Sequence, residues 1–480
     1  MSRISKTLLA SAAIVVSSSF PAFSQQLAEE VIKEYFAEAR ANGGTIDPGT
    51  MTVSGSTVEW ADIVITAPNG LGQMTLPFLR AEEIGGDKVS ITYPEMLAMQ
   101  MDPKAGAGAM TVTINLGDLE HIVSGTAAAR RHEYSATRIN YKIASEEIGL
   151  AMDLTMRDLK SSQINSGTDL RNIKGEISAA GLDLAYSLND DKINMSTTMT
   201  YADITADFDV DVVRNEDMQM LLTGERNMSV NFALGAGKQD TDIKQPEFSG
   251  VITALTESSK GSFSVVDGIF KMLGGSETIS YDLKFSELPL PPFQAEIDSV
   301  AIKMEMPLKK TDGTLPVNFL MNFTGLKASD TIWGMVDPTG SLPRDKATLN
   351  IDLTANMKWL VDLVELKNAA GMPAEVQDVT INNITLDVAG ARLEGQGSAV
   401  LDNSKFPPEP IGAVDLDLKG GVGLLDKLVA LGLVPQEQGQ MVKMFSGMFA
   451  VPGGGGGDHL TSKIEMKEGG SILVNGQQVK

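Results

Sequence analysis

The chain has 480 residues, no cysteine and 3 histidines, and its 62 acidic against 39 basic side chains give a formal net charge of -23. The lack of thiolates excludes thiol catalysis, iron–sulfur clusters and cysteine-bearing zinc sites. The excess of negative charge argues against nucleic acid or an anionic lipid surface as the main partner. With 42% hydrophobic and 21% charged residues, the composition is that of a folded chain.

Residues 1–24 have the pattern of a secretory signal peptide. Arg3 and Lys6 precede an apolar stretch over residues 8–16, and Ala22-Phe23-Ser24 forms a small-x-small cleavage pattern. The apolar stretch is shorter than the roughly 20 residues that a spanning helix needs. We therefore expect a mature chain without a transmembrane span, located in the periplasm of a Gram-negative bacterium. The alternative is that the segment stays attached as an N-terminal anchor.

A helix followed by long strands is predicted for the mature chain. Leu27, Val31 and Tyr35 recur at helical spacing within residues 25–44. From there on the dominant period is two, so each extended segment has one apolar and one polar face. Such strands belong to antiparallel sheets that are wet on one side, and the predicted fold is mainly β: long antiparallel curved sheets with a few short capping helices. The clearest alternating segments are 110–116, 139–143, 150–156, 182–188, 193–201, 228–234, 279–285, 300–306, 317–323, 349–357 and 414–418.

Two β-rich regions are predicted, over residues 45–288 and 293–452. The boundary falls in the proline-rich stretch 288–292, where helix and central strand are both disfavoured. Within the first region, the apolar run from Val265 to Leu273, followed by two glycines, predicts a short helix.

The second region contains a repeat and ends in a helix. Segments 351–366 and 416–431 each predict a strand, a capping helix and a Gly/Pro stop. Methionine and phenylalanine spacing over 441–449 predicts an amphipathic helix, whose candidate roles are a lid, a partner-binding helix and a cap over the sheet edge. The glycine run 453–457 predicts a flexible linker. Residues 458–480 predict a C-terminal β-hairpin with an Asn-Gly turn.

The sequence contains no complete catalytic or metal-binding motif of the common kinds. His132-Glu133 begins the zinc-protease pattern, but alanine occupies the position of the second histidine, so we expect a surface pair. Asp207, Asp209 and Asp211 resemble the start of a calcium loop that lacks its glycine and its final glutamate. Their alternation with apolar residues favours the solvent face of a strand over a weak calcium site. We expect a non-enzymatic protein with no catalytic residue, cofactor or metal.

The 25 methionines are the most unusual feature of the composition. Many lie on the apolar side of predicted strands, among them Met304, Met306, Met321 and Met357. Because the methionine side chain is flexible and polarisable, it suits surfaces that adapt to varied apolar partners. One interpretation is ordinary core filling. The other is that these four residues line a groove for lipid or acyl chains in a curved sheet.

Four strings carry a family resemblance: WGMVDP at 333–338, LPRD at 342–345, GLVP at 432–435 and GSILVNG at 470–476. They resemble an uncharacterised alphaproteobacterial family, a domain of unknown function (two-one-two-five), over most of the mature chain. The strings are typical of structural turns, and the resemblance supplies no functional residue. More distantly, the exported β-rich body and the closing hairpin are similar to AsmA-like and YdgA-like envelope proteins, which implies a groove-shaped, lipid-handling sheet. Such proteins commonly keep an N-terminal membrane anchor, whereas this chain has a cleavable signal pattern.

Two functions remain open from the sequence. The first is a non-enzymatic periplasmic protein that binds lipid or another apolar ligand in a curved β-groove. The second is a scaffold or interaction protein whose sheets are fully self-packed and which binds no small molecule.

Overall fold

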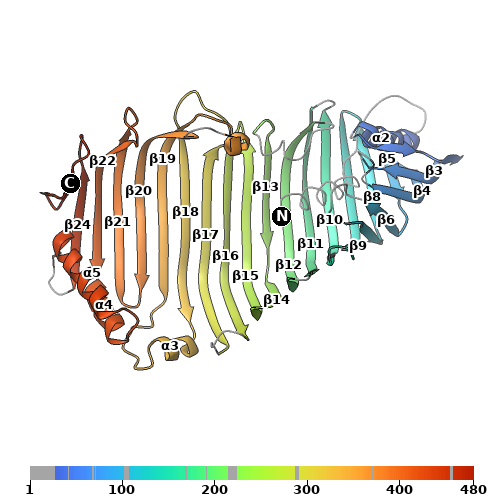
Figure 1. The fold of residues 1–480 in the computed structure, drawn as a ribbon. Helices are drawn as coiled ribbons and strands as arrows, with labels where there is room; N and C mark the ends of the chain where they lie inside the picture. The colour runs from blue at the N-terminus through green and yellow to red at the C-terminus, as the bar shows by residue number, and fades with distance from the viewer. Residues whose placement is uncertain are drawn as a thin grey trace. The chain divides into compact units, whose positions relative to one another are not determined.

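The computed structural model describes residues 27–41, 43–67, 70, 72–101, 108–167, 170–190, 192–213, 224–286, 291–368, 372–454 and 458–480. The predicted fold class is confirmed, because long antiparallel strands follow one another along the chain and a few short helices accompany them (Figure 1). The expected signal peptide lies outside the described residues. The chain forms two compact units, each described here by itself. Unit 1 is Met1–Thr253 with Phe285–Pro289, and unit 2 is Ala254–Lys284 with Leu290–Lys480.

Unit 1 begins with helix α2 (Leu27–Ala41), which confirms the helix predicted there. The chain leaves the unit within β15 (Phe248–Val266). The strands between them are β1 (Thr45–Asp47), β2 (Thr50–Ser54), β3 (Thr57–Thr66), β4 (Gly72–Gly85), β5 (Lys88–Thr92), β6 (Met96–Met101), β7 (Met110–Gly117), β8 (Glu120–Thr126), β9 (Ala129–Ser145), β10 (Leu150–Gly167), β11 (Leu170–Asn189), β12 (Asn194–Val213), β13 (Met228–Leu234) and β14 (Gly237–Gln245).

A sealed hydrophobic core lies between α2 and the strands of unit 1. Val31, Ile32 and Phe36 of α2 are buried together with apolar residues of β3 to β10. The rings of Phe36 and Trp60 meet edge to face, with centroids 5.8 Å apart. Helix α2 therefore packs on the apolar side of β3, β4 and β5, and the buried core continues across the strands to β10.

Two buried ion pairs fix α2 on the sheet. Arg130 of β9 donates to both carboxylate oxygens of Glu34, at 2.6 and 3.2 Å, and Arg171 of β11 pairs with Glu38. All four side chains are almost completely buried. Because a buried charge without its partner is costly, these pairs hold the helix in one position.

Unit 2 is a run of neighbouring antiparallel strands with short helices in some of the connections. Its strands are β16 (Ile269–Phe285), β17 (Phe293–Pro307), β18 (Leu315–Ala328), β19 (Ala347–Trp359), β20 (Ala374–Val388), β21 (Ala391–Asp402), β22 (Glu409–Lys419), β23 (Val451–Pro452), β24 (His459–Met466), β25 (Ile472–Val474) and β26 (Gln477–Gln478). Its helices are α3 (Asp330–Val336), the 3₁₀ helix η3 (Leu363–Asn368), α4 (Gly421–Ala430) and α5 (Gln436–Phe449). Strands β16 to β22 pair consecutively, and β22 pairs with β24.

The structure corrects one predicted helix. The run from Val265 to Leu273 is not a helix, because β15 and β16 meet there in a tight turn at Asp267 and Gly268, whose φ angles are 49° and 74°. An Asp-Gly pair with two positive φ angles is the usual two-residue hairpin turn, and this signal outweighs the apolar run around it.

The other predicted elements of unit 2 are present in modified form. In the repeat, the second copy forms α4 after its strand, whereas the first copy forms only the short η3. Helix α5 and the C-terminal hairpin lie where they were predicted. The boundary at 288–292 and the glycine linker fall partly on residues outside the described part of the chain and stay predictions.

The WGMVDP string builds the connection between β18 and β19. Helix α3 ends at Asp337, whose carboxylate accepts hydrogen bonds from the backbone N–H groups of Ser341, at 3.0 Å, and Leu342, at 2.7 Å. The side chain is completely buried. The string is therefore a turn motif, as its composition indicated.

Candidate functional site

The register of unit 2 joins apolar residues of successive strands into rows. Paired residues on antiparallel strands point to the same face of the sheet. One row of paired residues therefore runs from β16 to β24. We call the face of the sheet on which this row lies the apolar face. From β16 to β24, the row is Met272, Met304, Phe319, Leu353, Ile381, Gly397, Val414 and Ile464.

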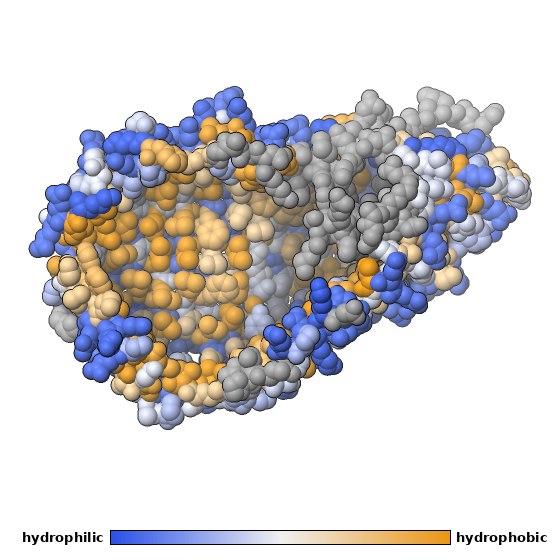
Figure 2. Space-filling model, viewed as in Figure 1, coloured by the Kyte–Doolittle hydropathy of each residue, from blue (hydrophilic) through white to orange (hydrophobic). Residues whose placement is uncertain are grey.

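No residue of this row is buried, although none carries a polar side chain. The equivalent row of unit 1 is sealed: Met74, Met99, Val112 and Ile143, paired in that order, are at most 8% exposed. The extended core cluster of the described residues belongs to unit 1. Figure 2 shows a hollowed surface lined by hydrophobic residues over the strands of unit 2 and edged by hydrophilic ones. Unit 2 thus presents an apolar surface that the described residues leave partly uncovered.

All four methionines predicted to line a groove lie on the apolar face. Met304 belongs to the row described above, and Met306, Met321 and Met357 lie two or four residues from it on β17, β18 and β19. Each is partly exposed. The structure therefore brings the four together on one surface; that they contact lipid stays a prediction.

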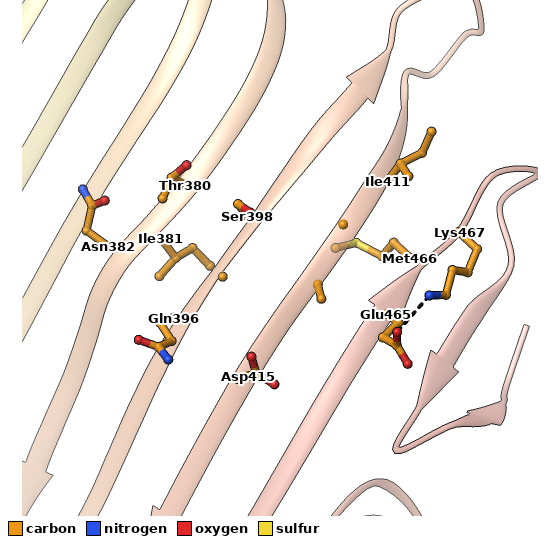
Figure 3. A pocket seen from close by; sticks show the side chains of 13 residues that line it. Thr380, Ile381, Asn382, Gln396, Ser398, Ile411, Asp415, Glu465, Met466 and Lys467 are labelled. Atoms are coloured by element: carbon orange, nitrogen blue, oxygen red, sulfur yellow. Dashed lines mark hydrogen bonds and ion pairs between the residues drawn. The ribbon is translucent and has the colours of Figure 1, made fainter.

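The opposite face of the same strands is polar. A shallow recess of about 690 Å³ lies there, and Thr380, Gln396, Ser398, Asp415 and Glu465 of its lining alternate with apolar-face positions (Figure 3). Figure 3 also shows Glu465 paired with a neighbouring lysine, at 2.8 Å. The recess is open, and its lining also includes Ile381, Gly397 and Met466, so it offers no enclosed catalytic geometry.

The structure corrects the interpretation of His132 as a surface residue. His132 and His121 are each 1% exposed, and their Nδ1 and Nε2 atoms lie 3.2 Å apart. The Tyr93 hydroxyl lies 2.9 Å from Nδ1 of His121, and the Tyr134 ring stacks on His121 with centroids 4.1 Å apart. Tyr35 of α2 completes this group, 3.5 Å from His121. These contacts join strands distant in sequence, so spacing along the chain did not reveal them.

Burial governs the protonation of this group. Desolvation, with the neighbouring His132, holds the pKa of His121 well below 6.5, and burial raises the pKa of Tyr134 and Tyr93. The histidine is therefore neutral in the folded protein at neutral pH. The group is part of the packing under α2.

The aspartates on β12 form hydrogen bonds across the sheet. Asn172 donates to Asp209, at 2.6 Å, and to Asp211, at 3.1 Å, and Asn231 donates to Asp207, at 2.7 Å. Within the described ranges, no group of three or more histidine and acidic side chains has the arrangement of a metal site. The strand interpretation of these residues accounts for their positions.

A family model matches part of the chain. Residues 281–473 match the model of a bacterial family described as an uncharacterized protein conserved in bacteria (DUF2125). This confirms the predicted family for a stretch that contains most of the apolar face; the alphaproteobacterial origin and the AsmA-like similarity stay predictions. No curated protein and no solved structure matched the chain. Among the helices of the described residues, none is long and apolar enough to cross a membrane.

Proposed function

We propose that the protein is an exported, non-enzymatic envelope protein of a Gram-negative bacterium, and that unit 2 binds the acyl chains of a lipid on its apolar face. The observation that supports this most strongly is the row from Met272 to Ile464, which lacks polar side chains on every strand and is nowhere buried. Folded proteins rarely leave a contiguous apolar patch larger than a few hundred Å² without a function for it.

The dimensions and chemistry of the apolar face suit acyl chains. Eight strands spaced about 4.8 Å apart give the row a length of roughly 34 Å, about twice the thickness of one leaflet of a bilayer whose hydrocarbon core is about 30 Å. Each methylene that leaves water contributes about 0.8 kcal/mol. Flexible methionine side chains adjust to chains of different length and unsaturation. A polar ligand would find no charged partner in the row.

The alternative of a fully self-packed scaffold fits unit 1 better than unit 2. In unit 1, helix α2 and the strands bury their apolar residues. In unit 2, Met304, Phe319 and Leu353 stay partly exposed at the centre of the sheet. Export is supported by the signal pattern of residues 1–24.

Mass spectrometry of organic extracts tests the proposal. The full mature protein is purified from its native compartment without detergent, and a delipidated sample is then titrated with a fluorescent fatty acid and with unlabelled palmitate as competitor. We expect a stoichiometric lipid in the extract and saturable, competed binding. A clean extract from folded protein, together with no saturable binding, would refute the lipid function. N-terminal sequencing that starts at Gln25 would support export, and an intact Met1 on the protein would count against it.

A further inference from the structure

Helix α5 packs on α4 with its less apolar side, whereas an ordinary amphipathic helix packs with its apolar side. The two helices approach closely at Gly439, where an added Cβ would lie 2.5 Å from Cγ2 of Val429. Lys443, on the same side of α5, pairs with Asp426 of α4. At these two contacts, α5 therefore meets α4 with a glycine and a charged residue rather than with large apolar side chains.

The large apolar side chains of α5 remain exposed. We call Met441, Val442, Met444, Phe445 and Met448 the outward arc, and their exposed fractions are 45% to 60%. Met441, Met444, Phe445 and Met448 recur at i, i+3, i+4 and i+7, which defines one helix face, and Val442 lies at its margin. In a globular protein such a face normally covers a core, whereas here it meets solvent.

The helix pair is anchored beside the apolar face. The Asp458 carboxylate accepts hydrogen bonds from the backbone N–H groups of Val422 and Gly423 at the start of α4, at 3.0 and 2.5 Å. At the end of α5, the Ser462 hydroxyl donates to the carbonyl of Phe449, at 2.6 Å. Ser462 pairs with an apolar-face residue of β22, and Figure 1 shows α4 and α5 beside β22 and β24. The outward arc therefore stands at the edge of the apolar face.

We propose that the outward arc docks on the surface of a lipid bilayer and brings the edge of the apolar face to it. The inference rests on the proposed function for its purpose, since transfer of a lipid between bilayer and sheet needs the two to meet. A 14-residue helix is about 21 Å long, too short to span a membrane and suited to lie in its interface.

The composition of the arc favours a bilayer over a protein partner. Protein interfaces combine apolar contacts with about ten direct hydrogen bonds, whereas the five side chains of the arc carry no charged group and no nitrogen or oxygen that could form one. The only formal charges of α5 are Glu437 and Lys443, and the lysine is paired with Asp426. Docking therefore depends on apolar insertion rather than on charge, and it should need no anionic lipid and respond little to salt.

The absence of cysteine from the chain permits a clean site-specific probe. Met448→Cys in the full chain carries an environment-sensitive fluorophore on the arc. Gly447→Cys is the matched control, since it lies away from the centre of the arc and its Cβ would meet open space. With vesicles of phosphatidylcholine and phosphatidylethanolamine, we expect a blue shift and quenching by brominated lipid for the label at 448, and little change for the label at 447. No shift at 448, or equal shifts at both positions, would overturn the inference.

A flotation assay measures the energetic role of the arc. The double variant Met444→Asp/Met448→Asp should partition onto the same vesicles at least about tenfold less than wild type, because two apolar side chains lose their insertion. Unchanged flotation would refute bilayer docking. So would a fluorescence shift of the label at 448 that appears without vesicles and depends on protein concentration, because it would indicate that a second copy of the chain binds the arc. The soluble fatty-acid titration separates the two proposals. If titration succeeds and flotation fails, only the docking inference falls; if flotation succeeds and titration fails, the lipid function falls.

Discussion

Replacing Met321 by aspartate tests whether the apolar face is open. Met321 lies in the middle of β18, paired with Ile302 and Ile351, and is partly exposed. Full burial of a methionine contributes about 1.5–3 kcal/mol. A partly exposed side chain contributes only a fraction of this, and the new carboxylate can stay hydrated. We expect the free energy of unfolding to fall by about 1 kcal/mol, while fatty-acid affinity falls at least about tenfold, because a charge then faces the acyl chain.

Two variants control this experiment. Asn322→Asp adds the same charge to the opposite face of the same strand and should leave fatty-acid binding unchanged. Met110→Asp places a carboxylate where the native side chain is 1% exposed, and it should cost more than about 4 kcal/mol. Urea unfolding and hydrogen exchange of the amides of β17 to β19 give the stability changes. If Met321→Asp destabilised the protein as severely as Met110→Asp, the face would be sealed and the argument for a binding surface would be wrong.

Two further predictions concern unit 1. Glu38→Gln should lower the free energy of unfolding by about 3–5 kcal/mol, because it leaves the buried Arg171 without its carboxylate. Amides of α2 should then exchange their hydrogens faster, whereas the exposed control Lys33→Gln should change this exchange little. Exchange in Glu38→Gln as slow as in wild type would contradict the prediction. Since the folded pKa of His121 lies well below 6.5, its contribution to stability is fully present above about pH 6.5 and is lost as the pH falls below that value. The melting temperature of His121→Gln should therefore decline less than that of wild type between about pH 7 and 5.5, and equal declines would contradict this assignment.

The strands were predictable because their signal is local. Alternation over 300–306, 317–323 and 349–357 fixes which side chains share a face, and a pairing register that keeps apolar partners opposite each other then follows. The row through Met304, Phe319 and Leu353 is the result. The helix predicted at Val265 to Leu273 failed because apolar residues also continue through a two-residue turn, and Asp267-Gly268 was the more informative signal.

Burial of isolated polar residues was not predictable in the same way. His132 follows Arg130 and Arg131 and precedes Glu133 on β9, and nothing in this charged segment indicates that the histidine is buried beside α2 and β8. Its environment depends on Tyr35 and His121, which come from other elements. The outward arc of α5 is a related case. Its spacing identified the helix, but only packing at Gly439 reveals that the apolar side faces away from α4.

Methionine content alone does not distinguish a core from a binding surface in this chain. Met74, Met99 and Met110 fill the sealed core of unit 1, at most 7% exposed, whereas Met304 and Met321 occupy equivalent strand positions in unit 2 and stay partly exposed. Alternation and composition are alike in the two units, and the units differ in what packs on the apolar faces of their strands. Unit 1 has α2, held on the strands by buried ion pairs, while in unit 2 helix α5 turns Met441, Met444 and Met448 toward solvent. In the proposed function, a lipid would cover the apolar face of unit 2 as α2 covers part of the apolar face of unit 1.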